Sequence, residues 1–231
     1  MNMPNSNITD VFFDLDHTLW DFDRNSALAF ERVFKKYEIQ LPLPDFLKEY
    51  EPINLIYWKK YREEMVTKEQ LRRGRLTETF DLFNMEFPLE TIDALAACYI
   101  EELPIDNHLF VDTIEILEYL SKKYTLHVIT NGFEEVQHLK LKNSAIKKYF
   151  SSITTSEEVG LKKPNPVIFE TALIKASTVP QKSIMIGDSF EADIVGAENV
   201  GMHTLFFNYR NEIVAETYFA VTTLSEIKRY L

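Results

Sequence analysis

Cysteine and long apolar runs are both scarce in this sequence of 231 residues. Its single cysteine, Cys98, cannot form a disulfide within the chain, and the surrounding segment ALAACYI is typical of a small packed side chain. No apolar run approaches the roughly 20 residues that span a bilayer, and the opening MNMPNSNITD has no basic-then-apolar signal pattern. We therefore expect a cytoplasmic protein without a membrane partner.

Positive charge is also in short supply. The chain has 25 Lys and Arg against 36 Asp and Glu, which gives a formal net charge of −11. This balance disfavours a nucleic-acid polymer or an anionic membrane as the main partner, because either would be repelled before any local contact formed. An anionic substrate therefore requires a local source of positive charge. The length and the hydrophobic fraction of 45% suit one large domain, or one domain that carries a smaller one.

The few glycines and histidines form no recognisable cofactor motif. The six glycines match neither a Walker loop nor a dinucleotide fingerprint. The five histidines are scattered, without metal-ligand spacing or a Ser or Cys partner: His17, His108, His127, His138 and His203. We expect them to be packed or surface residues.

What the sequence does contain is an alternation of short β-rich runs and helical patterns. Strands are predicted at 10–14, 124–130, 150–155, 183–188 and 202–207. Apolar residues at three- and four-residue spacing predict helices at 113–124, 165–176 and 191–202. This alternation indicates crossover units and a parallel sheet, hence an α/β fold.

The segment between the first strand and the rest of the sheet has a different pattern. From about 23 to 107 the sequence shows only helical periodicity, as in SALAFERVFKKY and TIDALAACYIEEL. We interpret this stretch as a helical insertion. The predicted organisation is an α/β core of 1–20 and 108–231, with a helical domain of 21–107.

Several predicted strands end on small polar or acidic residues. VFFD ends at Asp14, VITN at Thr130 and Asn131, and IMIGD at Asp188. Ligands of parallel α/β sheets bind at the carboxyl ends of the strands, so these residues are expected to meet. Asp14 and Asp16 share one side of the first strand, and crowded carboxylates repel unless a cation holds them. Oxygen ligands of this kind suit Mg²⁺.

Four motifs together resemble the haloacid dehalogenase superfamily, in the order in which that superfamily has them. They are DLDHT (14–18), VITNG (128–132), GLKKPNPVIF (160–169) and IGDSFEAD (186–193). The resemblance implies a Rossmann-like parallel-sheet core with an inserted α-helical cap, and Mg²⁺ as cofactor. The superfamily includes dehalogenases, mutases and phosphatases, so the fold alone does not select the reaction.

The resemblance also assigns roles to individual residues. Asp14 would be the nucleophile that forms an aspartyl-phosphate, and Asp16 the general acid and base. Thr130, Lys163 and the backbone amides of Asn131 and Gly132 would bind the phosphoryl group. Metal ligands would be Asp14, Asp188 and, through its backbone carbonyl, Asp16.

Two positions near these motifs have competing interpretations. Lys162 and Lys163 both precede the first proline of the third motif, and the family spacing selects Lys163, which directly precedes it. Asp193 would orient the lysine or a metal-bound water, or it is only an acid in the first turn of a helix.

The acid at position 16 favours phosphoryl transfer to and from oxygen over dehalogenation. Within phosphoryl transfer, the layout of the insertion resembles the bacterial pyrimidine 5′-nucleotidases. That resemblance implies a small phosphorylated metabolite, a pyrimidine nucleotide, as substrate. Candidates for substrate selection in the insertion are Asn54, Trp58 and Arg75, with Tyr57, Arg72 and Arg73 nearby, although helical aromatics are commonly core residues and basic runs are commonly solvated.

The alternatives left open are a general small-molecule or sugar phosphatase, a sugar-phosphate mutase and a non-catalytic phosphate-binding regulator. The residues do not specify an oligomeric state.

Overall fold

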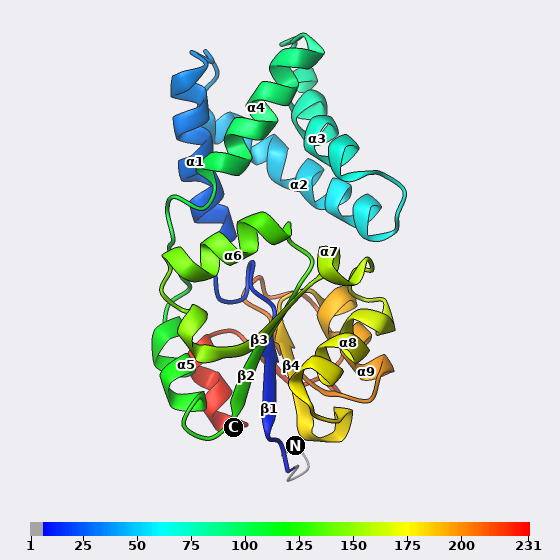
Figure 1. The fold of residues 1–231 in the computed structure, drawn as a ribbon. Coiled ribbons are helices and arrows are strands. Elements are labelled where there is room, and N and C mark those ends of the chain that lie inside the picture. The colour runs from blue at the N-terminus through cyan, green and yellow to red at the C-terminus, as the bar shows by residue number, and fades with distance from the viewer. Residues whose placement is uncertain (1–6) are drawn as a thin grey trace. The chain divides into compact units, whose positions relative to one another are not determined.

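The chain forms two compact units in a computed structural model that describes residues 7–231. One unit contains the chain up to Phe22 together with Asn107–Leu231, and the other is Asp23–Asp106 (Figure 1). The first unit holds every strand of the sheet and the second is helical. The second unit begins two residues later and ends one residue earlier than the expected insertion.

A six-stranded parallel sheet organises the first unit (Figure 1). Its spatial order is β3-β2-β1-β4-β5-β6, and β1 lies between β2 and β4. The strands are β1 (Asp10–Phe13), β2 (Thr125–Thr130), β3 (Phe150–Thr155), β4 (Ser183–Gly187), β5 (His203–Phe207) and β6 (Ala220–Val221). The order reverses direction at β1, which is where open α/β sheets bind ligands. The predicted α/β architecture is confirmed.

Helices cover the sheet and bury its apolar side chains. The helices of this unit are α5 (Thr113–Leu120), α6 (Glu134–Asn143), α7 (Ser156–Val159), α8 (Pro166–Ala176) and α9 (Gly196–Asn199). The chain also forms a π-helical turn, η3 (Phe190–Val195), and the 3₁₀ turns η1 (Lys147–Tyr149), η2 (Pro180–Lys182) and η4 (Leu224–Arg229). Phe12 and Met185 of the central strands pack with Phe169 of α8 and Ala197 of α9 in one buried cluster. A two-residue period along β1 then directs Val11 and Phe13, also fully buried, to the opposite face.

The helical unit contains α1 (Phe22–Lys36), α2 (Leu43–Arg62), α3 (Lys68–Leu82) and α4 (Leu89–Glu102). Thr67 starts α3 with a capping box, because its hydroxyl accepts from Gln70 N and its own N donates to Gln70 Oε1. The interior of the unit is largely aromatic. Phe30 stacks on Tyr99 with ring centroids 4.2 Å apart, and Phe46 stacks on Tyr50 at 5.3 Å.

Sequence periodicity missed or misjudged four parts of the sheet-containing unit. The single helix expected at 191–202 is the π-helical turn η3 followed by the short α9. Strand β6 and helices α6 and α7 lie in segments for which no element was predicted. Among residues 7–231, no helix is long and apolar enough to span a membrane.

Candidate active site

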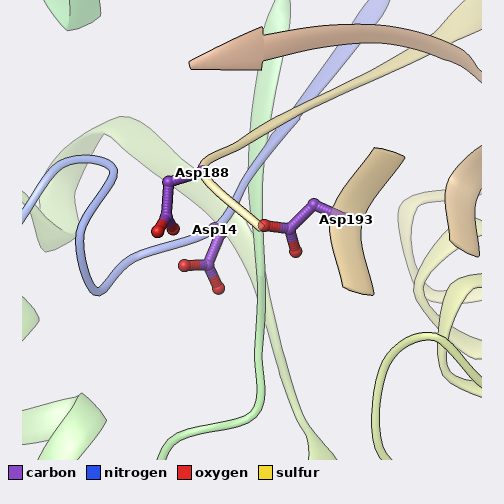
Figure 2. A group of neighbouring side chains, drawn as sticks. All are labelled: Asp14, Asp188 and Asp193. Carbon is purple, nitrogen blue, oxygen red and sulfur yellow. The ribbon is translucent and has the colours of Figure 1, made fainter. Parts of the chain in front are cut away.

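Asp14 follows the last residue of β1 at the centre of the sheet. Its backbone N donates to Ile186 O of the neighbouring β4 at 2.9 Å, so the strand pairing fixes its position. Asp188 follows the end of β4, and Asp193 lies in η3 (Figure 2). One carboxylate oxygen from each of these three residues lies within 4.8 Å of the others. Asp14 and the pair Asp188 and Asp193, which are distant from it in the sequence, therefore meet at the carboxyl edge of the sheet.

The ammonium group of Lys163 lies among these acids. Its Nζ is 2.5 Å from Asp14 Oδ1 and 2.6 Å from Asp193 Oδ1, and it donates to Ile129 O at 2.8 Å. The side chain is almost completely buried. Lys163 thus contacts two of the three acids, and its neighbour Lys162 is half-buried.

Asn131 fixes the backbone on which Lys163 is carried. Its side-chain Oδ1 accepts from Lys163 N at 2.8 Å, and its Nδ2 donates to Lys163 O at 2.9 Å. The bond between Lys163 and Pro164 is cis. Sequence reasoning predicted a role for the backbone amide of Asn131, whereas the structure shows its side chain joining the second motif to the third.

Burial and the repulsion between like charges raise the pKa values of two acids in this cluster. Burial, together with Asp193 and Asp16, raises the pKa of Asp14 to about 7, although Lys163 acts to lower it. Burial and the charges of Asp14 and Asp193 raise the pKa of Asp188 well above its usual range. Asp14 and Asp193 raise the pKa of Lys163 against the effect of burial. Two positive groups, Lys163 and the more distant Arg210, lie beside three carboxylates, which is the setting in which a bound cation relieves repulsion.

The donor set fits Mg²⁺. Each of the three acids offers a carboxylate oxygen, the type of ligand that this hard cation prefers. Both oxygens of Asp193 have close partners, since its Oδ1 faces Lys163 and its Oδ2 accepts from Ser189 N at 3.0 Å. Asp14 contacts Lys163 through Oδ1, and Asp188 Oδ1 accepts from Thr18 at the longer distance of 3.2 Å. Asp14 and Asp188 are therefore the two side chains best placed to bind the ion.

Thr130 ends β2 beside the cluster. Its Oγ1 accepts hydrogen bonds from Gln137 Nε2 at 2.6 Å and from Gly132 N at 3.1 Å. With both incoming bonds directed at the oxygen, the hydroxyl hydrogen remains available to donate. The backbone amide of Gly132, predicted to bind phosphate, donates to Thr130 here.

The side chain of Asp16 points to a different set of partners from that of Asp14. Its Oδ1 is 2.6 Å from Lys140 Nζ and its Oδ2 accepts from Gln137 Nε2 at 3.0 Å. The carboxylate of Asp16 is thus absent from the group formed by Asp14, Asp188 and Asp193. Both partners are carried by α6, the helix that sequence periodicity did not reveal.

The comparisons with known proteins identify the family. The sequence profile of the haloacid dehalogenase-like hydrolases matches residues 11–207. The chain belongs to the haloacid dehalogenase-like hydrolase family. It is 32% identical to the pyrimidine 5′-nucleotidase YjjG of Escherichia coli over 96% of each chain. It is also 32% identical to a glyceraldehyde 3-phosphate phosphatase of Methanothermobacter thermautotrophicus, over 86% of this chain and 84% of the relative.

A solved structure supports the same assignment. The HAD-hydrolase YfnB of Bacillus subtilis, crystallised bound to magnesium, superposes with a TM-score of 0.87 at 25% identity. The match covers 95% of this chain and 96% of the other. The resemblance drawn from the four motifs is therefore confirmed, and the chain is a hydrolase of this family.

Two residues beyond the four motifs also reach the site of this hydrolase. Arg210, in the segment after β5, places Nη1 3.7 Å from Asp188 Oδ2 and Nη2 3.0 Å from His17 Nδ1. Tyr209 OH lies 3.1 Å from the same His17 nitrogen. Sequence reasoning treated His17 as a packed or surface residue because it is the variable position of the first motif, and it did not consider Arg210, which lies outside the four motifs. Arg210 adds a second positive charge beside the acids.

The insertion residues singled out for substrate selection differ in exposure. Asn54 and Arg75 are buried, and Arg75 Nη1 donates to Asn54 Oδ1 at 2.9 Å. The Arg75 guanidinium also lies 5.1 Å from the centre of the Tyr99 ring. Trp58 is half-buried and packs edge-on against Tyr61.

The remaining three members of that group have partners within the helical unit. Arg73 forms ion pairs with Asp93 and Glu69, and Tyr57 OH donates to Glu78 Oε1 at 2.6 Å. Arg72 is half-buried on the same helix, α3.

Proposed function

We propose that this hydrolase is a Mg²⁺-dependent phosphomonoesterase that acts on pyrimidine nucleoside 5′-monophosphates. The observation that carries the proposal is the contact of one buried ammonium group, Lys163, with both Asp14 and Asp193 at the switch point of the sheet. An acid with a nearby cation suits attack on a phosphoryl group, whose charge needs local compensation in a protein of net charge −11. The named relatives supply the substrate class.

In the first step, a carboxylate oxygen of Asp14 forms a bond to phosphorus. The bond from phosphorus to the leaving oxygen breaks, and that oxygen takes a proton from Asp16. The Thr130 hydroxyl and the Lys163 ammonium hold the non-bridging phosphoryl oxygens. The product is a nucleoside and an aspartyl-phosphate on Asp14.

In the second step, a water oxygen attacks the same phosphorus atom. Its proton passes to Asp16, the bond between phosphorus and Asp14 breaks, and inorganic phosphate leaves. Asp16 is then protonated again and Asp14 is a free carboxylate, so the enzyme returns to its starting form.

Mg²⁺ would be held by Asp14, Asp188 and the backbone carbonyl of Asp16. When bound, the ion neutralises the acids and the phosphate dianion, which otherwise repel each other. Asp193 keeps its contact with Lys163 and orients that side chain.

A phosphatase of small sugar or triose phosphates is the second candidate. It is favoured by one specific finding, the equal identity of 32% to a relative named glyceraldehyde 3-phosphate phosphatase. The residues of the sheet-containing unit serve both functions, because they act on the phosphoryl group alone. Substrate selection is therefore what separates the two.

The deciding measurement is kcat/KM for a panel of phosphate esters in the presence of Mg²⁺. We expect UMP, dUMP and dTMP to be hydrolysed with a higher kcat/KM than AMP, GMP, hexose phosphates and glyceraldehyde 3-phosphate. A flat profile, or a preference for the triose, would reject the nucleotidase and keep the phosphatase. Absence of turnover on every ester would favour the non-catalytic regulator, and transfer of phosphate to a second sugar hydroxyl would identify a mutase.

Trp58 gives this proposal a residue-level test. Replacing Trp58 by Ala should lower kcat/KM for the preferred nucleotide by about tenfold to a hundredfold, because loss of a base-stacking contact typically costs about 1–3 kcal/mol. Hydrolysis of 4-nitrophenyl phosphate, which has no base, should change little. The control is Leu55→Ala on the same helix, where an exposed apolar side chain is truncated. Equal losses on both substrates would remove Trp58 from substrate selection.

A further inference from the structure

Helix α6 presents two buried polar side chains to Asp16. Gln137 and Lys140 are three residues apart, which places them on the same face of the helix. Gln137 is fully buried and Lys140 is 2% exposed. Buried polar groups of this kind need specific partners, and both find one in the same carboxylate.

Lys140 reaches Asp16 through an aromatic enclosure. Its Nζ lies 4.1 Å from the centre of the Trp20 ring and 5.2 Å from that of Phe22, at cation–π distance from both. The carboxylate it contacts is that of Asp16, whose Oδ1 is 2.6 Å away. The ammonium is therefore held in one place, and it holds Oδ1 in turn.

Gln137 connects the other oxygen of Asp16 to Thr130. Its Nε2 donates to Asp16 Oδ2 at 3.0 Å and to Thr130 Oγ1 at 2.6 Å, which uses both hydrogens of the amide. The bridge depends on Gly132, because a Cβ at that position would lie 2.1 Å from Gln137 Nε2. The amide oxygen Oε1 has no hydrogen-bond partner among the described residues, so the two bonds of Nε2 orient the group.

We infer that Gln137 and Lys140 are positioning residues for Asp16, which fix its carboxylate so that Oδ2 and not Oδ1 exchanges the proton. An ammonium group has only donors, so an oxygen held by Lys140 is a poor place for a further proton. Oδ2 is the oxygen tied through Gln137 to Thr130, beside the expected phosphoryl site. The inference rests on the proposed function, in which Asp16 is the acid and base.

The step most dependent on this arrangement is hydrolysis of the aspartyl-phosphate. There the water oxygen attacks phosphorus while its proton moves to Asp16 Oδ2, and the bond from phosphorus to Asp14 breaks. A carboxylate that rotates freely meets the water less often in the productive orientation. Formation of the aspartyl-phosphate from 4-nitrophenyl phosphate, in contrast, needs no acid, because nitrophenolate leaves as an anion.

The test is stopped-flow turnover of 4-nitrophenyl phosphate in Mg²⁺ buffer by Lys140→Met and Gln137→Met. We expect the first release of nitrophenolate, about one per enzyme, to keep its wild-type rate. The following steady phase should be at least about tenfold slower than in the wild type, with KM not raised. The control is Lys142→Met, an exposed lysine on the same helix, with turnover unchanged.

Two reference variants separate failure of this inference from failure of the proposed function. Asp16→Asn should show the same fast release and slow steady phase, and Asp14→Asn should release nothing. A normal steady phase in Asp16→Asn would overturn the acid–base assignment itself. If Asp16→Asn is slow but both α6 variants turn over within about threefold of the wild type, or lose the first release as well, the positioning role is wrong. Circular dichroism checks folding, and Gln137→Met, which alters no charge, decides the matter if Lys140→Met does not fold.

Discussion

Gly187 contributes to the site by having no side chain. It is the last residue of β4, directly before Asp188. A Cβ at this position would lie 2.2 Å from Asp193 Oδ2 and 2.4 Å from its Cγ, much closer than atoms in contact. Asp193 is 1% exposed, so it has little room in which to withdraw. The contact between Asp193 and Lys163 therefore requires a glycine at position 187.

Substituting Gly187 by Ala should displace Asp193 and release its hold on Lys163. We expect kcat on any phosphate ester to fall by at least about tenfold, the loss of one charge-assisted contact. The control is Gly201→Ala, where φ is +83° and the nearest atom lies 3.7 Å away. That change should cost about 1 kcal/mol of stability and leave kcat unaltered. Equal kcat in the two variants would show that Asp193 has no influence on turnover.

At the scale of the element, a buried polar chain joins the amino-terminal halves of three strands. His127 of β2 places Nε2 3.1 Å from Asp10 Oδ1 on β1 and Nδ1 2.7 Å from Ser152 Oγ on β3. Asp10 also accepts from Thr9 and Thr178. Because the Asp10 carboxylate can only accept, the neutral imidazole of His127 carries its hydrogen on Nε2 and donates it to Asp10, and Nδ1 accepts from Ser152.

These hydrogen-bonded side chains make the free energy of unfolding depend on pH in a defined direction. Burial lowers the pKa of His127 against the opposing effect of Asp10, and hydrogen bonds lower the pKa of Asp10 although burial acts to raise it. In each case the unfolded chain takes up a proton at a pH where the folded chain does not. Stability should therefore fall as pH drops below about 6.5, the usual pKa of histidine, and fall again below about 3.8.

The prediction is tested by urea unfolding of the wild type and of His127→Gln at pH 7 and pH 5. Glutamine keeps a donor and an acceptor but does not titrate. We expect the variant to lose less unfolding free energy between the two pH values, by at most about 1.4 kcal/mol per pH unit. The comparison cancels the contribution of other groups, such as the half-buried His17, whose pKa is lowered by desolvation and by the charge of Arg210. Parallel losses in the two proteins would exclude His127 as a source of the acid sensitivity.

Sequence patterns predicted five of the six strands and did not predict α6, for a physical reason. Strands β1 and β4 are mostly apolar and buried along their whole length, so their composition alone reveals them. The buried face of α6 consists of Val136, Gln137, Lys140 and Leu141. Half of that face is polar, which removes the apolar period on which helix prediction depends. Gln137 and Lys140, which contact Asp16, are therefore also the residues that prevented the prediction of α6.

Some residues of the candidate site could likewise be predicted from the sequence and others could not. Asp14, Thr130 and Asp188 were predictable because each follows or ends an apolar run, and parallel strands bring such ends together. Arg210 was not, because its approach to Asp188 depends on the path of the segment after β5. The hydrogen bonds of the Asn131 side chain were equally hidden, since they depend on the local geometry of two loops.

At the scale of the whole molecule, the charge is divided unevenly. The chain carries a net charge of −11, yet its candidate site combines Lys163, Lys140 and Arg210 within reach of four acids. Such an arrangement draws a cation to the acids and still provides positive groups for a phosphate. Binding of the cation should consequently stabilise the folded molecule, because the unfolded chain does not bring Asp14 and Asp188 together.

Thermal unfolding measures this coupling without reference to turnover. Adding Mg²⁺ at about ten times its dissociation constant should stabilise the wild type by about 1.4 kcal/mol, equivalent to a Tm increase of about 3–6 °C for a chain of this length. Asp188→Asn should lose most of the increase. NaCl at matched ionic strength is the control for general screening. An equal increase with NaCl, or in Asp188→Asn, would argue against the metal site.

The pairing of the two segments that flank the insertion has a consequence for engineering the protein. The segment that leaves the sheet-containing unit is already paired with the one that returns: Asp21 N donates to His108 O at 3.0 Å, and Phe110 N donates to Leu19 O at 3.0 Å. Trp20 and Leu109 form an antiparallel bridge between them. An insertion whose two ends are paired in this way can be replaced by another, because the hydrogen bonds between the two ends do not depend on the residues of the insertion. If the insertion selects the substrate, as we propose, grafting another insertion between these paired segments should change the substrate preference and leave the residues around Asp14 in place.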